Sequence, residues 1–279
     1  MKRINTRGLT FFKLNFYFHS LCLIVFFPMF LPGRGLAQPS MEAVKAYNTY
    51  IAQVEGAINQ RHHAGGTILA QSAADTQRDA RLRSGEFAIE RVLNEQKSEL
   101  PGALLHYWRG SAFVQGAKAA DVERLLKKFE GYPELYKPQV LAANILAQNG
   151  DSLRATMRVR QKHVLTVVMD STYDVVFGRV DAQHGYSASR STQISEIEDA
   201  GTKNEHRLSE KEEHGFLWRQ NTYWSYEERD GGVYLQIESV SLSRAIPTGL
   251  GWALRPFVES VPRESLEFTL RATCNALKK

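Results

Sequence analysis

The stretch VLAANILAQNGDSLRATMRVR, residues 140–160, decides the fold more than any other part of the chain. Two segments rich in aliphatic side chains, 140–147 and 153–160, flank the dipeptide Asn149-Gly150. Asn-Gly between two apolar runs is the strongest short signal for a β-hairpin, because both residues accept the positive φ of a tight turn. The stretch therefore predicts two antiparallel strands.

A second hairpin is predicted further along the chain. The segments 216–228 and 233–243 flank Asp230-Gly231-Gly232, another turn sequence. Between the two hairpins, 164–177 and 186–198 have the composition of two more strands. Consecutive hairpins build an antiparallel meander, and one face of such a sheet has to be covered by another element.

The part before the meander begins with a predicted helix at 41–61. Apolar residues recur there at steps of three and four, and Ser40 is a plausible N-cap. Residues 64–85 contain few large apolar side chains and are expected to form an irregular connector before the main domain. Two strands are then predicted at 86–93 and 104–114.

The remaining helices are predicted on both sides of the meander. One covers 117–130 and is ended by Gly131-Tyr132-Pro133. After Pro247 the chain turns helical again, and a final helix is expected over 263–277 with Pro262 at its first position. Its inward stripe is formed by Leu266, Leu270, Thr273 and Leu277. The predicted fold class is α+β, a curved antiparallel sheet wrapped around a long C-terminal helix, with an extra N-terminal helix.

This layout resembles the START-like (SRPBCC) superfamily, whose fold is called the helix-grip. The resemblance is carried by His106 to Val114 followed by 117–129, by Tyr132-Pro133-Glu134-Leu135-Tyr136-Lys137-Pro138, by 223–234 with its Gly-Gly turn, and by 247–277. The resemblance covers roughly residues 104–278. In particular, the sequence looks like exported bacterial members of the superfamily whose activity is unknown. The resemblance implies a pocket for a hydrophobic ligand between sheet and C-terminal helix, and it transfers no catalytic residue.

The N-terminal segment has the pattern of a secretory signal peptide. Basic residues precede an apolar run at 14–31, and Gly35-Leu36-Ala37 follows with small residues where a signal peptidase reads. Cleavage is expected after Ala37, which places the protein in the periplasm or outside the cell. The alternative is a retained membrane anchor. The predicted domains are thus 1–37 as signal peptide, 38–100 as N-terminal helix and connector, and 101–279 as the START-like domain.

Composition excludes several classes of protein. The chain of 279 residues is 43% hydrophobic and 23% charged, which does not fit intrinsic disorder, and two cysteines exclude a disulfide scaffold. Residues 1–37 hold five basic and no acidic residues, the whole excess of 35 basic over 30 acidic residues. The net charge of +5 therefore belongs to the export signal, and no nucleic-acid partner is expected.

Aromatic residues and arginines on the predicted strands are the candidate ligand contacts. Aromatic side chains on one sheet face would line a cavity with apolar walls and a few polar tips, although ordinary core filling is the alternative. A strand arginine turned inward would need a carboxylate partner or an acidic ligand head group, and otherwise it faces solvent. The predicted ligand-binding residues are Trp108, Tyr173, Arg190, Trp218, Trp224 and Phe257.

The alternation of side chains along a strand also predicts how one strand is oriented. Because side chains alternate along a strand, Tyr223 and Trp224 cannot both face inward, and we expect Trp224 and Tyr226 to face opposite sides as well. The other strand arginines that interrupt apolar runs are Arg109, Arg158 and Arg219.

No sequence motif indicates a catalytic or metal centre. The adjacent His62-His63 cannot chelate from one helix face, no zinc or nucleophile motif occurs, and Cys274 is expected as a small apolar residue. No cofactor is predicted. The charged loop 199–215 is a solvated connection or, alternatively, a lid.

Three functions are compatible with the sequence. The first is an exported binding or transport protein for a hydrophobic or amphipathic, lipid-like small molecule, with transient membrane contact as a further expectation. The second is an enzyme of cyclase or hydrolase type that uses the same pocket, which requires at least two polar titratable groups converging inside. The third is an envelope interaction module with a packed core, in which the helix at 41–61 docks a partner. The oligomeric state is left open.

Overall fold

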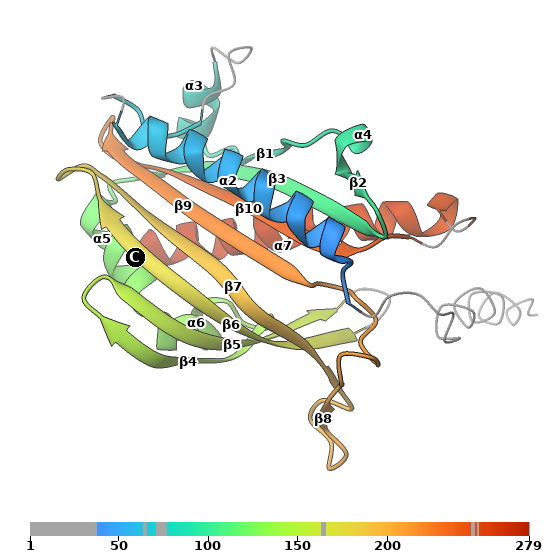
Figure 1. Ribbon diagram of the computed structural model, residues 1–279. Coiled ribbons are helices and arrows are strands. Elements are labelled where there is room, and N and C mark those ends of the chain that lie inside the picture. The colour runs from blue at the N-terminus through green and yellow to red at the C-terminus, as the bar shows by residue number, and fades with distance from the viewer. Residues whose placement is uncertain are drawn as a thin grey trace, which may run out of the picture. The chain divides into compact units, whose positions relative to one another are not determined.

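The computed structural model describes residues 38–63, 66–70, 77–162, 166–246, 249 and 251–278, and at positions 95, 96, 251–254, 256 and 257 it describes the backbone alone (Figure 1). These residues belong to one compact unit. The predicted signal peptide lies outside the described residues. Among the described helices, none combines the length and the apolarity needed to cross a bilayer.

The described residues form an antiparallel sheet of ten strands, which confirms the predicted meander. The main path runs β1-β3-β10-β9-β7-β6-β5-β4, while β2 pairs with β3 and β8 with β7. The strands are β1 (Ala88–Arg91), β2 (Glu99–Leu100), β3 (Ala103–Gln115), β4 (Val140–Asn149), β5 (Ser152–Lys162), β6 (Thr166–Arg179), β7 (His184–Glu198), β8 (His206–Arg207), β9 (Arg219–Arg229) and β10 (Gly232–Arg244).

Both predicted hairpins are present, and their turns show why. In the first, Asn149 pairs with Ser152, so the two loop residues are Gly150 and Asp151, with Gly150 at φ 55°. The turn is thus shifted by one residue from the Asn-Gly pair. In the second, Asp230 and Gly231 form the loop with φ values of 56° and 74°. Two positive φ values are the condition of the hairpin turn whose twist matches that of the strands.

Strand β4 is the last strand of the sheet path, with no strand paired on its other side among the described residues. Its register against β5 shifts between Val140 and Ala142 and again between Ile145 and Ala147. The residues at these two bulges, Leu141 and Leu146, are 40% and 58% exposed. Bulges add twist and interrupt the hydrogen-bond ladder of a strand.

The helices agree with the prediction at the N-terminus and differ from it further on. They are α2 (Met41–His63), α3 (Arg78–Arg83), α4 (Glu95–Ser98), α5 (Ala119–Lys127), the 3₁₀ turn η2 (Phe129–Gly131), α6 (Tyr132–Leu135) and α7 (Gly251–Leu277). Ser40 caps α2 as expected, because its hydroxyl accepts a hydrogen bond from the Ala43 amide at 3.1 Å. The helix expected over 117–130 is shorter, and Pro133 opens α6 instead of ending α5.

The C-terminal helix is one continuous element, so the prediction of a helix start at Pro262 was wrong. Proline removes one backbone donor from a helix interior, at a substantial cost. The cost is offset because the helix buries a stripe beyond this point, with Leu266 and Leu270 almost fully buried against the sheet. Gly110 of β3 makes this contact close: a Cβ there would lie 2.5 Å from a Leu266 methyl carbon.

The sheet is covered on both faces (Figure 1). We call the face packed against α7 the inner face and the face packed against α2 the outer face. The inner cluster includes Val114, Trp224, Leu235 and Leu270, while the outer cluster includes Tyr47 and Ile58 of α2 together with strand residues. The described part of the expected connector packs on the outer face too, where Ile68 is 2% exposed.

Candidate functional site

The six predicted ligand-binding residues do not share one face. Trp108, Tyr173 and Trp224 lie on the inner face, in or against the cluster that packs on α7. Trp218 belongs to the outer cluster with α2, so it is not placed to line a pocket under α7. The side chain of Phe257 lies outside the described residues.

Arg190 also lies on the outer face, which corrects the prediction of an inward arginine. Its Nε donates to a carboxylate oxygen of Glu55 on α2 at 2.6 Å, and the Tyr223 hydroxyl donates to the same oxygen at 2.8 Å. The arginine has the carboxylate partner that the sequence reasoning required, but the partner comes from the protein.

The prediction that Trp224 and Tyr226 face opposite sides was wrong. Both belong to the inner cluster, while Tyr223 belongs to the outer one. The reason is the strand period of two, which places residues i and i+2 on the same face. Tyr226 lies across Gly185 of the neighbouring strand, where a Cβ would come within 2.4 Å of its hydroxyl oxygen.

The inner face changes character along β10. Val233, Leu235 and Ile237 belong to the inner apolar cluster, and the next positions on that face are Ser239, Ser241 and Ser243. Ser241 and Ser243 are 5% and 7% exposed and Ser239 is half-buried, so the polar positions are largely covered. One strand therefore presents an apolar half and a hydroxyl-bearing half to the same covered side.

His106 of β3 adjoins the serines. It lies directly opposite Ser241, and its Nε2 is 3.1 Å from the Ser243 hydroxyl oxygen. Burial, and to a smaller extent the nearby Arg91 guanidinium, lowers the pKa of His106 to about 4. The imidazole is therefore neutral at neutral pH.

This histidine–serine pair does not make a hydrolase site among the described residues. A base in a catalytic triad is made more basic by a carboxylate on its other nitrogen. The charged group that acts on His106 is Arg91, which has the opposite effect on the imidazole pKa. The geometry fits a hydrogen-bonding wall better than a nucleophile with its base.

Trp108 stands where the apolar and polar halves meet. It pairs with Ser239 on one side and with Arg91 of β1 on the other, and directly opposite residues share a face. Its indole Nε1 is buried and finds no hydrogen-bond partner among the residues that the structure describes. A buried N–H without an acceptor is unfavourable by roughly 1–3 kcal/mol.

The charge of Arg91 is already matched. Its Nη1 lies 3.3 Å from a carboxylate oxygen of Glu259 on α7, and its Nη2 donates to the Ser98 hydroxyl at 3.4 Å. Arg255, one turn earlier on α7, pairs with Glu99 at 2.8 Å and lies 3.7 Å from Glu259. Ion pairs thus connect the N-terminal half of α7 to β1 and β2.

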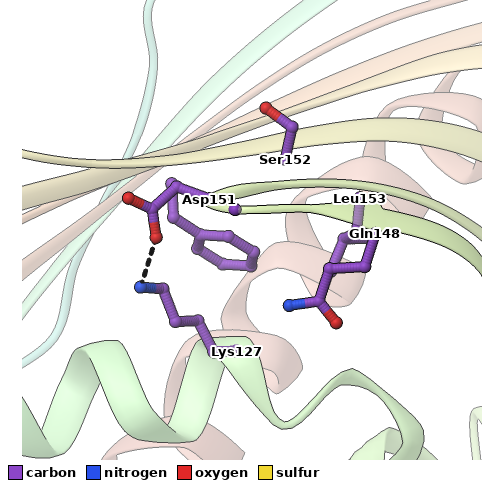
Figure 2. A pocket seen from close by; sticks show the side chains of 7 residues that line it. Lys127, Gln148, Asp151, Ser152 and Leu153 are labelled. Atoms are coloured by element: carbon purple, nitrogen blue, oxygen red, sulfur yellow. Dashed lines mark hydrogen bonds and ion pairs between the residues drawn. The ribbon is translucent and has the colours of Figure 1, made fainter.

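A separate hollow lies between α5 and the β4–β5 hairpin (Figure 2). Lys127 reaches across it to Asp151 at 2.7 Å and also pairs with Glu123 at 2.6 Å. The volume is about 10 Å³, roughly the room for one water molecule. This hollow is too small for a lipid-like ligand.

The outer face holds a buried charge cluster that sequence reasoning missed. Glu238 of β10 is 1% exposed and accepts hydrogen bonds from Arg109 Nε and Nη2 at 3.2 and 3.0 Å. Arg61 of α2 adds a bond at 2.5 Å, and the Tyr107 hydroxyl donates to the same carboxylate. The cluster joins α2 to the sheet. Its signal in the sequence was the alternation of these polar residues with apolar ones on β3 and β10.

The other strand arginines also have partners within the protein. Arg158 forms two bonds to the Asp170 carboxylate at 2.7 and 2.8 Å and one to Glu205 in the charged loop, and Arg219 donates to the Trp218 carbonyl. Each of the four strand arginines, of which Arg190 was the one predicted to bind a ligand, therefore has a partner among the described residues.

The charged loop 199–215 is tethered at its end. The Glu196 carboxylate accepts hydrogen bonds from the backbone amides of His214, Gly215 and Phe216 at 2.9 to 3.0 Å. Within the described part of the chain, no group of three or more potential metal ligands occurs. Cys274 is buried and unpaired, and burial raises the pKa of its thiol to about 12.

The strand order and the closing helix have the layout of a helix-grip fold, here with an added helical layer on the outer face. No family model and no curated protein matches the sequence. Three of the solved structures to which the chain is similar serve as examples. They are a STAR-related lipid transfer protein fragment from Xanthomonas axonopodis (16% identity, 68% of this chain and 99% of that chain, TM-score 0.42), the Zhui aromatase/cyclase from Streptomyces sp. R1128 (14%, 62% and 94%, 0.44) and human STARD10 (8%, 75% and 82%, 0.41). At these identities the likeness is one of fold alone, so the candidate site rests on the residues described above.

Proposed function

We propose that the chain is an exported binding or transport protein for a hydrophobic or amphipathic, lipid-like small molecule, held between the inner face and α7. The observation that carries the proposal is the change along the inner face of β10 from Leu235 and Ile237 to Ser239 and Ser241. A purely structural core would be expected to stay apolar under a covering helix. An amphipathic lining fits a guest with an acyl or ring body and one polar end.

Export is the second part of the proposal. It is supported by the basic start, the apolar run at 14–31 and the small residues before Gln38. Mass spectrometry of the protein isolated from its native host should give a chain that begins at Gln38. A full-length chain in the cytosolic fraction would contradict export without touching the binding proposal.

The binding part can be tested with a brominated acyl lipid, because bromine quenches tryptophan fluorescence on contact. The chain has four tryptophans, of which Trp108 and Trp224 lie on the inner face and Trp218 on the outer face. We expect saturable quenching by dibrominated acyl lipid. Replacing Trp108 or Trp224 by Phe should remove part of the quenched signal.

Trp218→Phe is the matched control, because Trp218 is buried to a similar degree as Trp224, at 2% against 6% exposure. In this variant the quenched part of the emission should stay as large as in the unmodified protein. An absence of quenching would refute the binding proposal, and a loss confined to the Trp218 variant would place the ligand on the outer face instead.

A further inference from the structure

The polar half of the inner face holds a buried donor that lacks an acceptor among the residues that the structure describes. Trp108 Nε1–H is buried and without a partner among the described residues. An indole nitrogen only donates hydrogen bonds, so a group that satisfies it must bring an acceptor. A ligand oxygen at this point would recover the unfavourable free energy of the unmatched donor.

The same surroundings do not favour an anion. Arg91 lies directly opposite Trp108 on β1, and its guanidinium already pairs with Glu259 of α7. A carboxylate or phosphate placed beside Trp108 would therefore face the Glu259 charge as well as the Arg91 charge. Because the two charges largely offset each other, little attraction for an anion remains to repay its desolvation.

The neighbouring polar groups are neutral. Ser239 and Ser241 carry hydroxyls, which can donate or accept, and His106 is an uncharged imidazole bonded to Ser243. A wall of hydroxyls and neutral nitrogen donors can bind an ester carbonyl or an alcohol without any charge on the ligand.

We propose that the inner-face site selects lipids whose polar end is a neutral hydrogen-bond acceptor, such as an acyl ester or a fatty alcohol, over the ionised acid. Trp108 donates the hydrogen bond to the neutral acceptor. The Arg91–Glu259 pair excludes an anion. This inference rests on the proposed function and specifies the ligand class of that same site.

The test compares two ligands that differ only at the head: 9,10-dibromostearate and its methyl ester, at a pH where the acid is ionised. Binding is followed by quenching of tryptophan fluorescence in the chain that starts at Gln38. We expect the ester to bind at least tenfold more tightly. In Trp108→Phe, the remaining Trp224 still reports binding. This variant should bind the ester about fivefold to tenfold more weakly because one hydrogen bond is lost. Its affinity for the acid should not change.

The charge argument has its own variant. Glu259→Gln leaves Arg91 without its carboxylate partner and should raise the affinity for the dibromostearate anion by about tenfold, with ester binding unchanged. Glu99→Gln is the matched control, since it removes one negative charge next to Arg255 on the same side of α7 but leaves the Arg91–Glu259 pair in place. This control should change neither affinity.

The outcomes separate the inference from the function on which it rests. Binding of the acid as tight as or tighter than the ester would overturn the inference and leave the binding function standing. Acid affinity that does not rise in Glu259→Gln would overturn the assignment of anion exclusion to that residue. Quenching by neither ligand would remove the proposed function itself.

Discussion

Removal of Arg109 should show how strongly the outer charge cluster holds α2 and the sheet together. The Glu238 side chain is 2% exposed and that of Arg109 is 13% exposed, so their pair is almost fully withdrawn from water. Breaking a buried ion pair from one side typically costs about 3–5 kcal/mol, because the remaining charge stays buried. In Arg109→Leu the Arg61 guanidinium still contacts Glu238, which should reduce the loss to about 2–4 kcal/mol.

The measurement is urea unfolding of the chain that starts at Gln38, followed by circular dichroism. The double variant Arg109→Leu/Glu238→Leu removes both charges and leaves neither of them buried alone. Its loss in free energy of unfolding should therefore be smaller, by at least about 1.5 kcal/mol, than the losses of the two single variants added together. Arg158→Leu is the control. Its pair with Asp170 is more exposed, at 29% and 26%, and its loss should stay below about 1 kcal/mol.

Two results would refute this reasoning. A loss below about 1 kcal/mol in Arg109→Leu would mean that the Glu238 carboxylate is not held as a buried ion pair with Arg109. Strict additivity of the two single substitutions would mean that Arg109 and Glu238 act on stability through other neighbours.

Three further predictions follow from buried groups. Burial lowers the pKa of both His62 and His106 to about 4, below the unfolded value, so stability is fully present above about pH 6.5 and is lost as the pH falls toward 4. Between pH 7 and pH 5 each histidine should lower the free energy of unfolding by about 2 kcal/mol, which thermal unfolding at a series of pH values would measure. His62→Phe can keep the ring stack on Tyr186 and should flatten the dependence of stability on pH. An unchanged dependence would contradict the assignment of His62 as neutral. Gly178→Ala should destabilise by about 1–3 kcal/mol, because a Cβ would lie 2.2 Å from the Tyr186 ring; a neutral effect in urea unfolding would show that the ring moves freely. The Cys274 thiol should resist iodoacetamide at pH 8 in the native protein and react in urea, and alkylation of the native protein at the unfolded rate would disprove its burial.

The strand meander could be predicted from the sequence because its turns are local. Gly150 and the Asp230-Gly231 pair adopt positive φ values that few residues accept, so their positions fix both hairpins. The inward stripe of the C-terminal helix could also be predicted: Leu266, Leu270 and Thr273 are buried, and Leu277 is partly buried against the inner cluster. The start of α7 was missed because the same local logic takes Pro262 as a helix boundary, whereas packing on Gly110 keeps the helix continuous.

The division of the site between two faces could not be predicted in the same way. Period two says which residues share a face of one strand, and applied consistently it would have placed Trp224 and Tyr226 together. The period does not say which face of the sheet α2 covers. Trp218 and Arg190 lie on that face, so their contacts with α2 could not be predicted from the strand pattern. The Arg91–Glu259 pair joins β1 to α7 across 168 positions of sequence, a distance at which no local pattern operates.

The two bulges of β4 have a consequence for the protein at high concentration. An open sheet edge is a template on which the strand of another molecule can be added, and charged side chains are the common protection against such growth. From Val140 to Asn149 this strand has no charged residue. We expect its irregular register at Leu141 and Leu146 to disfavour such addition, because an incoming strand needs a flat, continuous ladder. The two bulges would then also disfavour the growth of fibres from this edge.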